Sequence, residues 1–488
     1  MKQLPASLMA SLKNIKGFSR EAFQQVHASG EQVTSIRINP VKVKSDELKV
    51  KSGEEEHSEM SNVKAETTSA SKQSAIANLQ SAIPWCPYGY YLSSRPSFTF
   101  DPLLHAGAYY VQEASSMFLW QVLKQTVGDN TTGLKVLDLC AAPGGKSTLL
   151  ASYFQDGLVV ANDVIRSRAA ILVENITKWG SANTVVTNND PKDFAALEGY
   201  FDVMIIDAPC SGSGLFRRDA DAIAEWSEDN VQLCSQRQQR ILADVYNALK
   251  NNGILVYSTC SYSKQEDEDI LDWICTTFNL ESLRLTIDDA WGIIETESDT
   301  HGAYGYRFYP DKVKGEGLFI AALRKMDGNK GEEYRMQGLQ KISKEETALV
   351  ADIVNKQDDL FYFKQGENII AAPSQWKNDI AILQKHLYLR KAGITVGILK
   401  GKDIVPDHEL AMSALVDKNI PRAALTKEEA IQYLQKKDIQ VSNLDKGWAL
   451  ATYNQISLGW IKVLHNRVNN YYPVEWRILK DNAPVDNL

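Results

Sequence analysis

The chain has 488 residues, of which 44% are hydrophobic and 23% charged, and its net charge is −8. This length exceeds one ordinary core and predicts two to four domains, and the composition is that of a globular protein. A membrane span is excluded because no stretch approaches the roughly 18 uncharged apolar residues that one needs.

The N-terminal region begins with a short mildly apolar run that lacks a small-residue cleavage site, so we expect no signal peptide and a cytoplasmic protein. A helical segment and the strand-like run Gln32–Pro40 follow, which together predict a small α+β N-terminal domain over residues 1–100. From Ser45 to Gln73 the chain is rich in Ser, Glu and Lys and has no aromatic residue. This composition predicts a disordered insertion at about 45–73.

The central region, residues 101–325, alternates buried-looking strands with helical stretches, a pattern typical of a parallel α/β sheet covered on both faces. The expected strands are Lys135–Leu139, Leu158–Asn162, Thr184–Asn188, Val203–Asp207 and Ile254–Ser258. A further run, Gly317–Leu323, is expected at the edge of the sheet.

The C-terminal third begins with a mixed polar stretch, residues 326–380, which we interpret only as a connecting region. Beyond it, three strand-like runs predict a small β-rich module over residues 381–480. These runs are Ile394–Leu399, Gly447–Tyr453 and Leu458–Leu464.

Charge is distributed unevenly along the chain. Residues 1–44 carry seven Lys or Arg against two acidic residues, and residues 381–480 carry fifteen against nine, whereas residues 74–380 are acidic overall. The total charge argues against a polyanionic partner, but basic flanks around an acidic body are compatible with an enzyme that holds RNA through its accessory parts.

A candidate cofactor loop follows the first central strand, where Val136–Thr148 predicts a strand, a small-residue turn and a helix start. Small residues allow close approach of a ligand to the backbone, and the free amides that open the helix favour a carboxylate or phosphate. Cys140 stands where a P-loop needs glycine, and the GxGxxG pattern is absent, so both nucleotide motifs are disfavoured.

Two acidic residues support a nucleoside ligand at the same sheet edge. Asp163 follows the second strand, where doubly wound folds bind ribose hydroxyls, and Asp190 follows the third strand and can meet an adenine edge. The alternative is a tight turn and two solvated acids without a ligand. It would not require the turn, Asp163 and Asp190 to lie at the same edge of the sheet. The expected cofactor-binding residues are Ala141, Ala142, Pro143, Gly144, Gly145, Lys146, Ser147, Asp163, Arg168, Asp190 and Asp207.

Two cysteines form a candidate chemical site. Cys210 follows a strand that ends in Asp207, and Cys260 follows the next strand of the sheet. Ser263–Glu266 matches a capping box, so Cys260 is expected just before a helix N-terminus, which favours the thiolate.

This residue combination suits methylation of carbon 5 of cytosine, which is not nucleophilic enough to take a methyl group directly. A thiolate that adds at carbon 6 activates the ring, and Asp207 can assist at nitrogen 3 if burial raises its pKa. Free cysteines are usually small buried residues, and packing is the better interpretation of Cys140. The shared position of the other two in polar turns favours chemistry. The six cysteines include no CxxC pair, so neither a metal site nor a disulfide framework is expected.

The segments DLCAAPGGKS, DAPCSGSG and STCS, with the lead-in Tyr110–Met117, resemble the Nop/Sun family of RNA cytosine-5 methyltransferases over residues 35–324. The resemblance implies a Rossmann-like class I methyltransferase core that uses S-adenosyl-L-methionine. It implies that Cys260 is the nucleophile and Cys210 the release residue, and that Lys146 points toward the substrate.

The whole architecture is similar to the branch of that family that modifies small-subunit ribosomal RNA and ends in a PUA-like RNA-binding domain. Lys446–Trp448, Leu458–Lys462 and Asn469–Pro473 are similar to that domain, and the N-terminal domain is likewise implied to bind RNA. The insertion after Lys44 departs from the family pattern. We expect a monomer acting on RNA, with 16S rRNA favoured. A tRNA cytosine-5 methyltransferase, a small-molecule or protein methyltransferase, and a ribosome-assembly factor without activity remain alternatives, which the two cysteines would discriminate.

Overall fold

The computed structural model describes residues 4–44, 74–327, 334, 336, 338–442 and 444–481. The insertion expected at 45–73 lies outside these residues. None of the described helices is long and apolar enough to cross a membrane.

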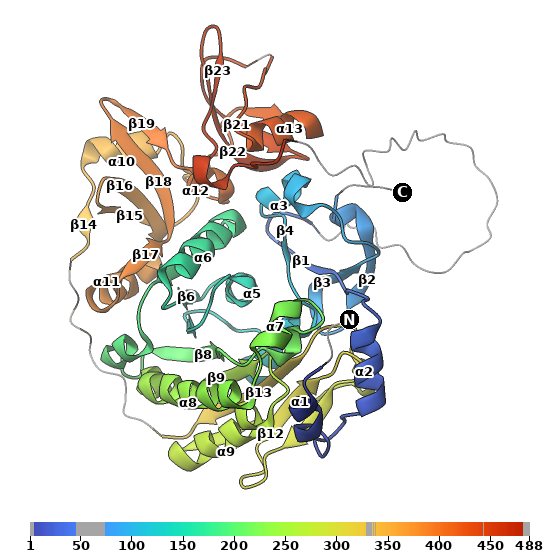
Figure 1. The fold of residues 1–488 in the computed structure, drawn as a ribbon. Coiled ribbons are helices and arrows are strands. Elements are labelled where there is room, and N and C mark those ends of the chain that lie inside the picture. The colour runs from blue at the N-terminus through green and yellow to red at the C-terminus, as the bar shows by residue number, and fades with distance from the viewer. Residues whose placement is uncertain are drawn as a thin grey trace, which may run out of the picture.

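The N-terminal region contains helices α1 (Ala6–Ser11) and α2 (Arg20–Ala28) and a four-stranded sheet of order β2-β3-β1-β4. Its strands are β1 (Ser35–Ile38), β2 (Leu79–Ile83), β3 (Cys86–Leu92) and β4 (Tyr109–Val111). The sheet packs beside the large central sheet (Figure 1). Arg37 of β1 makes part of this contact, because its buried guanidinium donates to the side chains of Gln112 and Thr148.

The central sheet has the strand order β11-β12-β13-β9-β8-β5-β6-β7-β17, and β10 (Leu280–Ser282) also pairs with β13. Its parallel strands are β5 (Lys135–Asp138), β6 (Leu158–Asn162), β7 (Thr184–Thr187), β8 (Phe201–Asp207) and β9 (Leu249–Thr259). These agree with the five expected strands to within a few residues at each end.

The expectation of an edge strand at 317–323 was wrong. Strand β13 (Leu318–Lys325) pairs with β9 on one side and with β12 (Tyr304–Phe308) on the other, and β11 (Ile294–Glu297) extends the sheet further. β13 is an interior strand, which explains why its side chains are buried on both faces.

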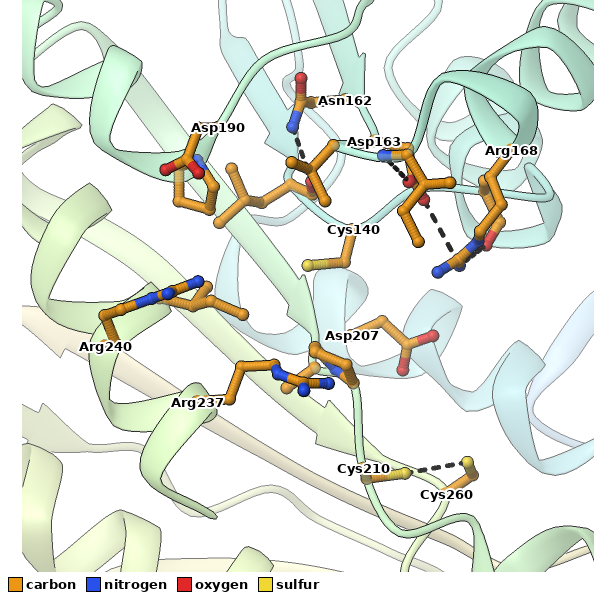
Figure 2. A pocket seen from close by; sticks show the side chains of 18 of the residues that line it. Cys140, Asn162, Asp163, Arg168, Asp190, Asp207, Cys210, Arg237, Arg240 and Cys260 are labelled. Carbon is orange, nitrogen blue, oxygen red and sulfur yellow. Dashed lines mark hydrogen bonds and ion pairs between the residues drawn. The ribbon is translucent and has the colours of Figure 1, made fainter. Parts of the chain in front are cut away.

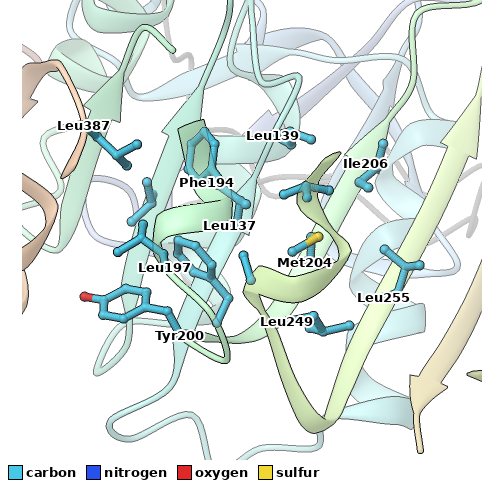
Figure 3. Packing of buried hydrophobic residues seen from close by; sticks show 14 of the residues in the cluster. Leu137, Leu139, Phe194, Leu197, Tyr200, Met204, Ile206, Leu249, Leu255 and Leu387 are labelled. Atoms are coloured by element: carbon cyan, nitrogen blue, oxygen red, sulfur yellow. The ribbon is translucent and has the colours of Figure 1, made fainter. Parts of the chain in front are cut away.

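Alternate side chains of the strands pack into two separate hydrophobic cores, one on each face of the sheet. In β8, Met204 and Ile206 face one core with helices α8 (Glu228–Val245) and α9 (Glu268–Thr277), whereas Val203 and Ile205 face the other with α4 (Leu119–Thr126) and α5 (Gly145–Tyr153). Figure 3 shows the first core, where Leu137 of β5 lies near Phe194 and Tyr200. Helix α6 (Arg166–Trp179) covers β6 and β7 beside α5. Helices on both faces leave the carboxyl edge of the parallel strands open for a site.

The region beyond residue 338 forms a third β sheet of order β14-β15-β16-β18-β19. Its strands are β14 (Gln340–Lys341), β15 (Leu360–Gln365), β16 (Asn368–Pro373), β18 (Ile394–Lys400) and β19 (Asp403–Pro406), and the segment also contains α10 (Lys344–Val350) and α11 (Lys377–His386). Strand β17 (Leu389–Ala392) lies within this stretch of sequence but pairs antiparallel with β7 of the central sheet. The boundary proposed near residue 381 therefore falls inside α11, which packs against the central core.

A last sheet, β20-β21-β22-β23, comprises Arg422–Ala424, Gly447–Tyr453, Ile456–Val463 and Val468–Asn470, with α13 (Lys427–Leu434) packed against it. Helix α12 (His408–Met412) lies between this sheet and α6. The three expected C-terminal runs are therefore all strands, but they belong to two different sheets.

Candidate active site

A pocket of about 550 Å³ opens at the carboxyl edge of strands β5 to β9 (Figure 2). It is lined by Leu139, Cys140, Ala142, Asn162, Asp163, Val164, Ile165, Arg168, Asp190, Pro191, Asp207, Ala208, Pro209, Cys210, Gly212, Leu215, Arg237, Arg240, Ile241 and Cys260. The loops expected to carry a cofactor and those expected to carry chemistry thus share one cavity.

The loop after β5 contributes fewer lining residues than expected. Of the described residues in this loop, Cys140 and Ala142 line the pocket, whereas Ala141 and Gly144 are buried and Pro143 is exposed elsewhere. Gly144 has φ +116°, a conformation that glycine adopts at little cost, and it begins helix α5 at Gly145.

Ser147 stabilises the conformation of this loop, because its buried hydroxyl donates a hydrogen bond to Asp138 Oδ2 at 2.6 Å. Burial raises the pKa of Asp138 to about 7 although that hydrogen bond opposes the rise. Ser147 therefore ties the end of β5 to the first turn of α5.

The acids after β6 and β7 both reach the pocket. The buried Asp163 accepts a hydrogen bond from the Ile165 amide at 2.9 Å and lies 3.3 Å from the Arg168 guanidinium. Arg168 also donates to the Ala142 carbonyl at 2.7 Å, so it joins the loops after β5 and β6. Asp190 caps the short helix Pro191–Ala196 and lines the same cavity.

The two expected thiols meet at the far end of the pocket. The Sγ atoms of Cys210 and Cys260 lie 3.1 Å apart, although the residues are 50 positions apart in sequence. The hydrogen bond with the Cys260 thiol, together with burial, holds the pKa of Cys210 well above its ordinary value. Cys210 is therefore kept protonated beside Cys260, an arrangement that suits different roles for the two sulfurs.

The expected capping box at Ser263–Glu266 was wrong. Only a short 3-10 turn starts at Lys264, α9 starts at Glu268, and the Ser263 hydroxyl has no hydrogen-bond partner within the described residues. Glu266 instead accepts hydrogen bonds from the Ser211 amide at 2.7 Å and the Ser261 hydroxyl at 2.6 Å. One buried carboxylate thus fixes the loops of both cysteines.

Asp207 and Lys146 form the charged pair of the site. Lys146 Nζ lies 2.8 Å from Asp207 Oδ2, and Ser258 donates to Asp207 Oδ1 at 2.8 Å. Burial disfavours the charge of Lys146, but the neighbouring Asp207 carboxylate raises the pKa of the ammonium above its usual value. The Asp207 side chain is 35% exposed, so it is partly open to the cavity.

The fold and the site together define a Rossmann-like class I methyltransferase, a class whose cofactor is S-adenosylmethionine. This assignment follows from the strand order β12-β13-β9-β8-β5-β6-β7, in which β13 is antiparallel to both β12 and β9. The expected fold class is confirmed.

Comparison with known proteins narrows the class to a family. Residues 125–324 match the family model of 16S rRNA methyltransferase RsmB/F, residues 421–478 that of the methyltransferase RsmF PUA domain, and residues 54–114 that of the N-terminal domain of 16S rRNA methyltransferase RsmF. A ribosomal RNA small subunit methyltransferase F from Shewanella loihica is 30% identical over 410 residues, which cover 80% of this chain and 82% of that protein. The protein of the same name from Pectobacterium atrosepticum is 29% identical over 82% of this chain and 84% of its own length. The chain belongs to the ribosomal RNA small subunit methyltransferase F family.

A solved structure has the same fold. The crystal structure of PH0851 matches with a TM-score of 0.54 and 24% identity over 66% of each chain. At this identity the match supports the fold alone.

The pocket residues fit the cofactor of this class. Asp163 and Asp190 offer carboxylate oxygens for ribose and adenine, and the partly exposed apolar side chains of Val164 and Ile165 offer a surface on which a purine can pack. The three acids of the pocket also suit a ligand that carries a sulfonium cation, and its volume lies in the range of small-molecule sites. Among the described residues no group of His, Cys, Asp or Glu could hold a metal ion.

Several lining residues had no sequence signal that we used. Cys140, interpreted as a packing residue, lines the pocket while also touching the core. Val164 and Ile165 could have been found as an apolar pair directly after the expected ribose-binding acid. Arg237 and Arg240 lie 27 and 30 residues beyond Cys210 on a long polar helix, where nothing distinguishes them from solvated arginines.

Proposed function

We propose that the protein methylates carbon 5 of a cytosine in RNA, through a covalent bond between Cys260 and carbon 6 of the base. The single observation that carries the proposal is the 3.1 Å contact between Cys210 and Cys260 inside a methyltransferase pocket. Transfer of a methyl group to an oxygen or nitrogen atom has no need for two thiols, whereas carbon 5 of cytosine needs a nucleophile at carbon 6 to become reactive.

The proposed reaction uses four side chains of this pocket. The Cys260 thiolate forms a bond to carbon 6, and Asp207 relays a proton from the neighbouring Lys146 ammonium to nitrogen 3, so that the ring becomes a neutral enamine. Lys146 Nζ lies 2.8 Å from Asp207 Oδ2, within reach for this transfer. Bound S-adenosylmethionine supplies the methyl group that carbon 5 then takes up.

Product release requires removal of the carbon 5 proton, elimination of the Cys260 sulfur as a thiolate, and return of the nitrogen 3 proton through Asp207. Cys210 lies beside that sulfur and acts in this step. Because its pKa is held high, Cys210 must first lose its proton to the medium or to a base before it can accept the proton from carbon 5. This order keeps Cys210 from competing with Cys260 as the nucleophile.

We further propose 16S rRNA as the substrate and a monomer as the active form. The names of the relatives and of the matching family models support this RNA, and the basic C-terminal sheet region matched to a PUA domain supports RNA binding outside the catalytic core.

The cysteine variants test the mechanism. In vitro-transcribed 16S rRNA and S-adenosylmethionine are mixed with each variant and resolved on a denaturing gel. Cys210→Ala should accumulate a covalent protein–RNA adduct, Cys260→Ala should form none, and both should lose turnover. Cys275→Ala, on α9 and outside the pocket lining, is the matched control and should behave as the wild type. If neither Cys210→Ala nor Cys260→Ala changes methylation, the mechanism is wrong.

The position of the product requires a second experiment. Bisulfite sequencing of 16S rRNA and tRNA from a deletion strain should show one cytosine in 16S rRNA that has lost its methyl group. Loss of a tRNA site instead would replace the proposed substrate, and loss at neither RNA would favour an assembly role.

A further inference from the structure

Two arginines of helix α8, Arg237 and Arg240, line the catalytic pocket beside the expected ligand residues. Both side chains are exposed, and Figure 2 shows them extending from α8 toward the centre of the cavity. Positions three apart on a helix lie on the same face, about one turn from each other. The two guanidinium groups therefore present a paired positive surface to whatever enters.

These arginines differ from the other cations of the site, which already have acidic partners. Arg168 pairs with Asp163, and Lys146 pairs with Asp207. Across the ranges of the chain that the structure describes, neither Arg237 nor Arg240 forms a hydrogen bond or an ion pair. Their charge is available for a ligand that brings negative groups of its own.

The two arginines are better suited to RNA phosphates than to the carboxylate of the methionine part of the cofactor. Helix α5, whose N-terminal amides follow the loop after β5, covers the sheet face opposite to α8. Helix N-termini favour carboxylates, so the α5 N-terminus offers an alternative place for the cofactor carboxylate. One carboxylate also cannot occupy two guanidinium groups and the α5 amides together, whereas RNA carries one phosphate for every nucleotide.

We infer that Arg237 and Arg240 bind the phosphodiester groups next to the target cytosine and so hold the base over Cys260. This inference rests on the proposed function. A guanidinium fork matches phosphate oxygens in two parallel hydrogen bonds, which fixes direction as well as distance. The arginines act as positioning residues that raise affinity for RNA and do not touch the reacting atoms.

The test compares the double variant Arg237→Gln/Arg240→Gln with the wild type in the full-length protein. Arg284→Gln is the matched control, because Arg284 is an exposed arginine paired with Glu295 outside the catalytic pocket. Three quantities are measured: the Kd for in vitro-transcribed 16S rRNA from 50 to 300 mM salt, the Kd for S-adenosylmethionine, and the kcat and KM of methyl transfer.

We expect the double variant to lose about tenfold in RNA affinity at 0.15 M salt, and the salt slope to fall by about 1.4, the value for two lost contacts to a single strand. The KM for RNA should rise in proportion, whereas kcat at saturating RNA and the Kd for S-adenosylmethionine should stay within about twofold, because contacts made equally in the ground and transition states change KM alone. Arg284→Gln should change none of these values.

Two results would overturn the inference while leaving the proposed function intact. An unchanged salt slope with wild-type methylation would show that the arginines contact no phosphate. A weakened Kd for S-adenosylmethionine with unchanged RNA binding would assign them to the cofactor carboxylate. If the wild type itself transfers no methyl group to RNA, the proposed function fails first and the inference falls with it.

Discussion

The Glu266 carboxylate accepts two hydrogen bonds from Ser211, one from its amide at 2.7 Å and one from its hydroxyl at 2.5 Å. It also accepts from the Ser261 hydroxyl, and Ser211 and Ser261 directly follow the two pocket cysteines in sequence. Burial raises the pKa of Glu266 even though these hydrogen bonds oppose the rise. The contact between the two sulfurs therefore depends on a residue that lies outside the pocket lining.

Replacing Glu266 should uncouple the two cysteine loops. Glu266→Ala leaves the buried Ser211 amide without its partner, which costs about 1–3 kcal/mol in the free energy of unfolding. We expect methyl transfer to fall more than tenfold at a temperature where the variant is still folded, because the sulfurs lose their fixed separation. Glu266→Gln keeps one acceptor oxygen and should recover part of both properties.

The measurement is single-turnover methylation beside urea unfolding of the same samples. Glu281→Ala, at an exposed position of β10, is the control for loss of a carboxylate. Wild-type single-turnover rates in a destabilised Glu266→Ala protein would contradict the positioning role, because they would show that Glu266 contributes only to stability.

Asp163 provides a separate test of cofactor binding. Its side chain is 3% exposed and is oriented by the Ile165 amide and by Arg168. Asp163→Asn removes the charge while keeping the size, and hydrogen bonds to charged groups contribute about 1.5–3 kcal/mol. We expect the Kd for S-adenosylmethionine, measured by calorimetry, to rise by about ten- to a hundredfold, since each 1.4 kcal/mol is a factor of ten.

RNA affinity in the absence of the cofactor should not change in Asp163→Asn. A cofactor Kd equal to that of the wild type would remove Asp163 from the cofactor site and leave Asp190 as the main acidic contact.

The sequence was sufficient for the parts of the site that rest on strand ends. The central strands are short apolar runs, so their carboxyl ends could be placed within a residue or two, and the acids and cysteines that follow them converge as expected. Glu266 could not be interpreted correctly because the local Ser-x-x-Glu pattern fits a cap, whereas the competing donor, Ser211, lies 55 residues away. A local pattern carries no information about such a long-range competitor.

Long-range packing also explains why the position of β17 and the role of the two pocket arginines could not be predicted from the sequence. β17 has only four residues, and its partner β7 lies about 200 positions earlier in the chain, so its place in the central sheet follows from tertiary packing alone. Arg237 and Arg240 become part of a site only once α8 is placed beside the β8 loop.

The Lys146–Asp207 pair makes a prediction about chemistry rather than binding. Asp207→Asn keeps the shape of the side chain but cannot transfer a proton to nitrogen 3, and positioned acids contribute typically about 10²- to 10⁴-fold to rate. We expect the single-turnover rate to fall within that range, and the rate of adduct formation in a Cys210→Ala background to fall equally. If the adduct forms at the normal rate in Asp207→Asn/Cys210→Ala, Asp207 does not act in the addition step. Asp202→Asn, an acid of the same strand outside the pocket, is the control.

His408 predicts how stability depends on pH. Both ring nitrogens of this buried side chain lack hydrogen-bond partners among the described residues, and the ring packs against Tyr472 and Trp476. Burial lowers the pKa of His408 from 6.5 to about 3. Below pH 6.5 the folded protein therefore binds fewer protons at His408 than the unfolded chain does. The free energy of unfolding is thus highest above pH 6.5 and decreases as pH falls from there toward 3.

Leucine at this position should remove that dependence. His408→Leu keeps a side chain of similar size and sacrifices no hydrogen bond, so it should be as stable as the wild type at pH 8. Between pH 6.5 and 5 it should lose less stability, by up to about 1.4 kcal/mol for each pH unit, the free energy of one unit of pKa difference. Urea unfolding followed by tryptophan fluorescence at pH 8, 7, 6 and 5 measures the difference, with the exposed His301→Gln as the control. Parallel pH profiles for His408→Leu and the wild type would show that the His408 ring takes up its proton without unfolding the contact between α12 and the C-terminal sheet.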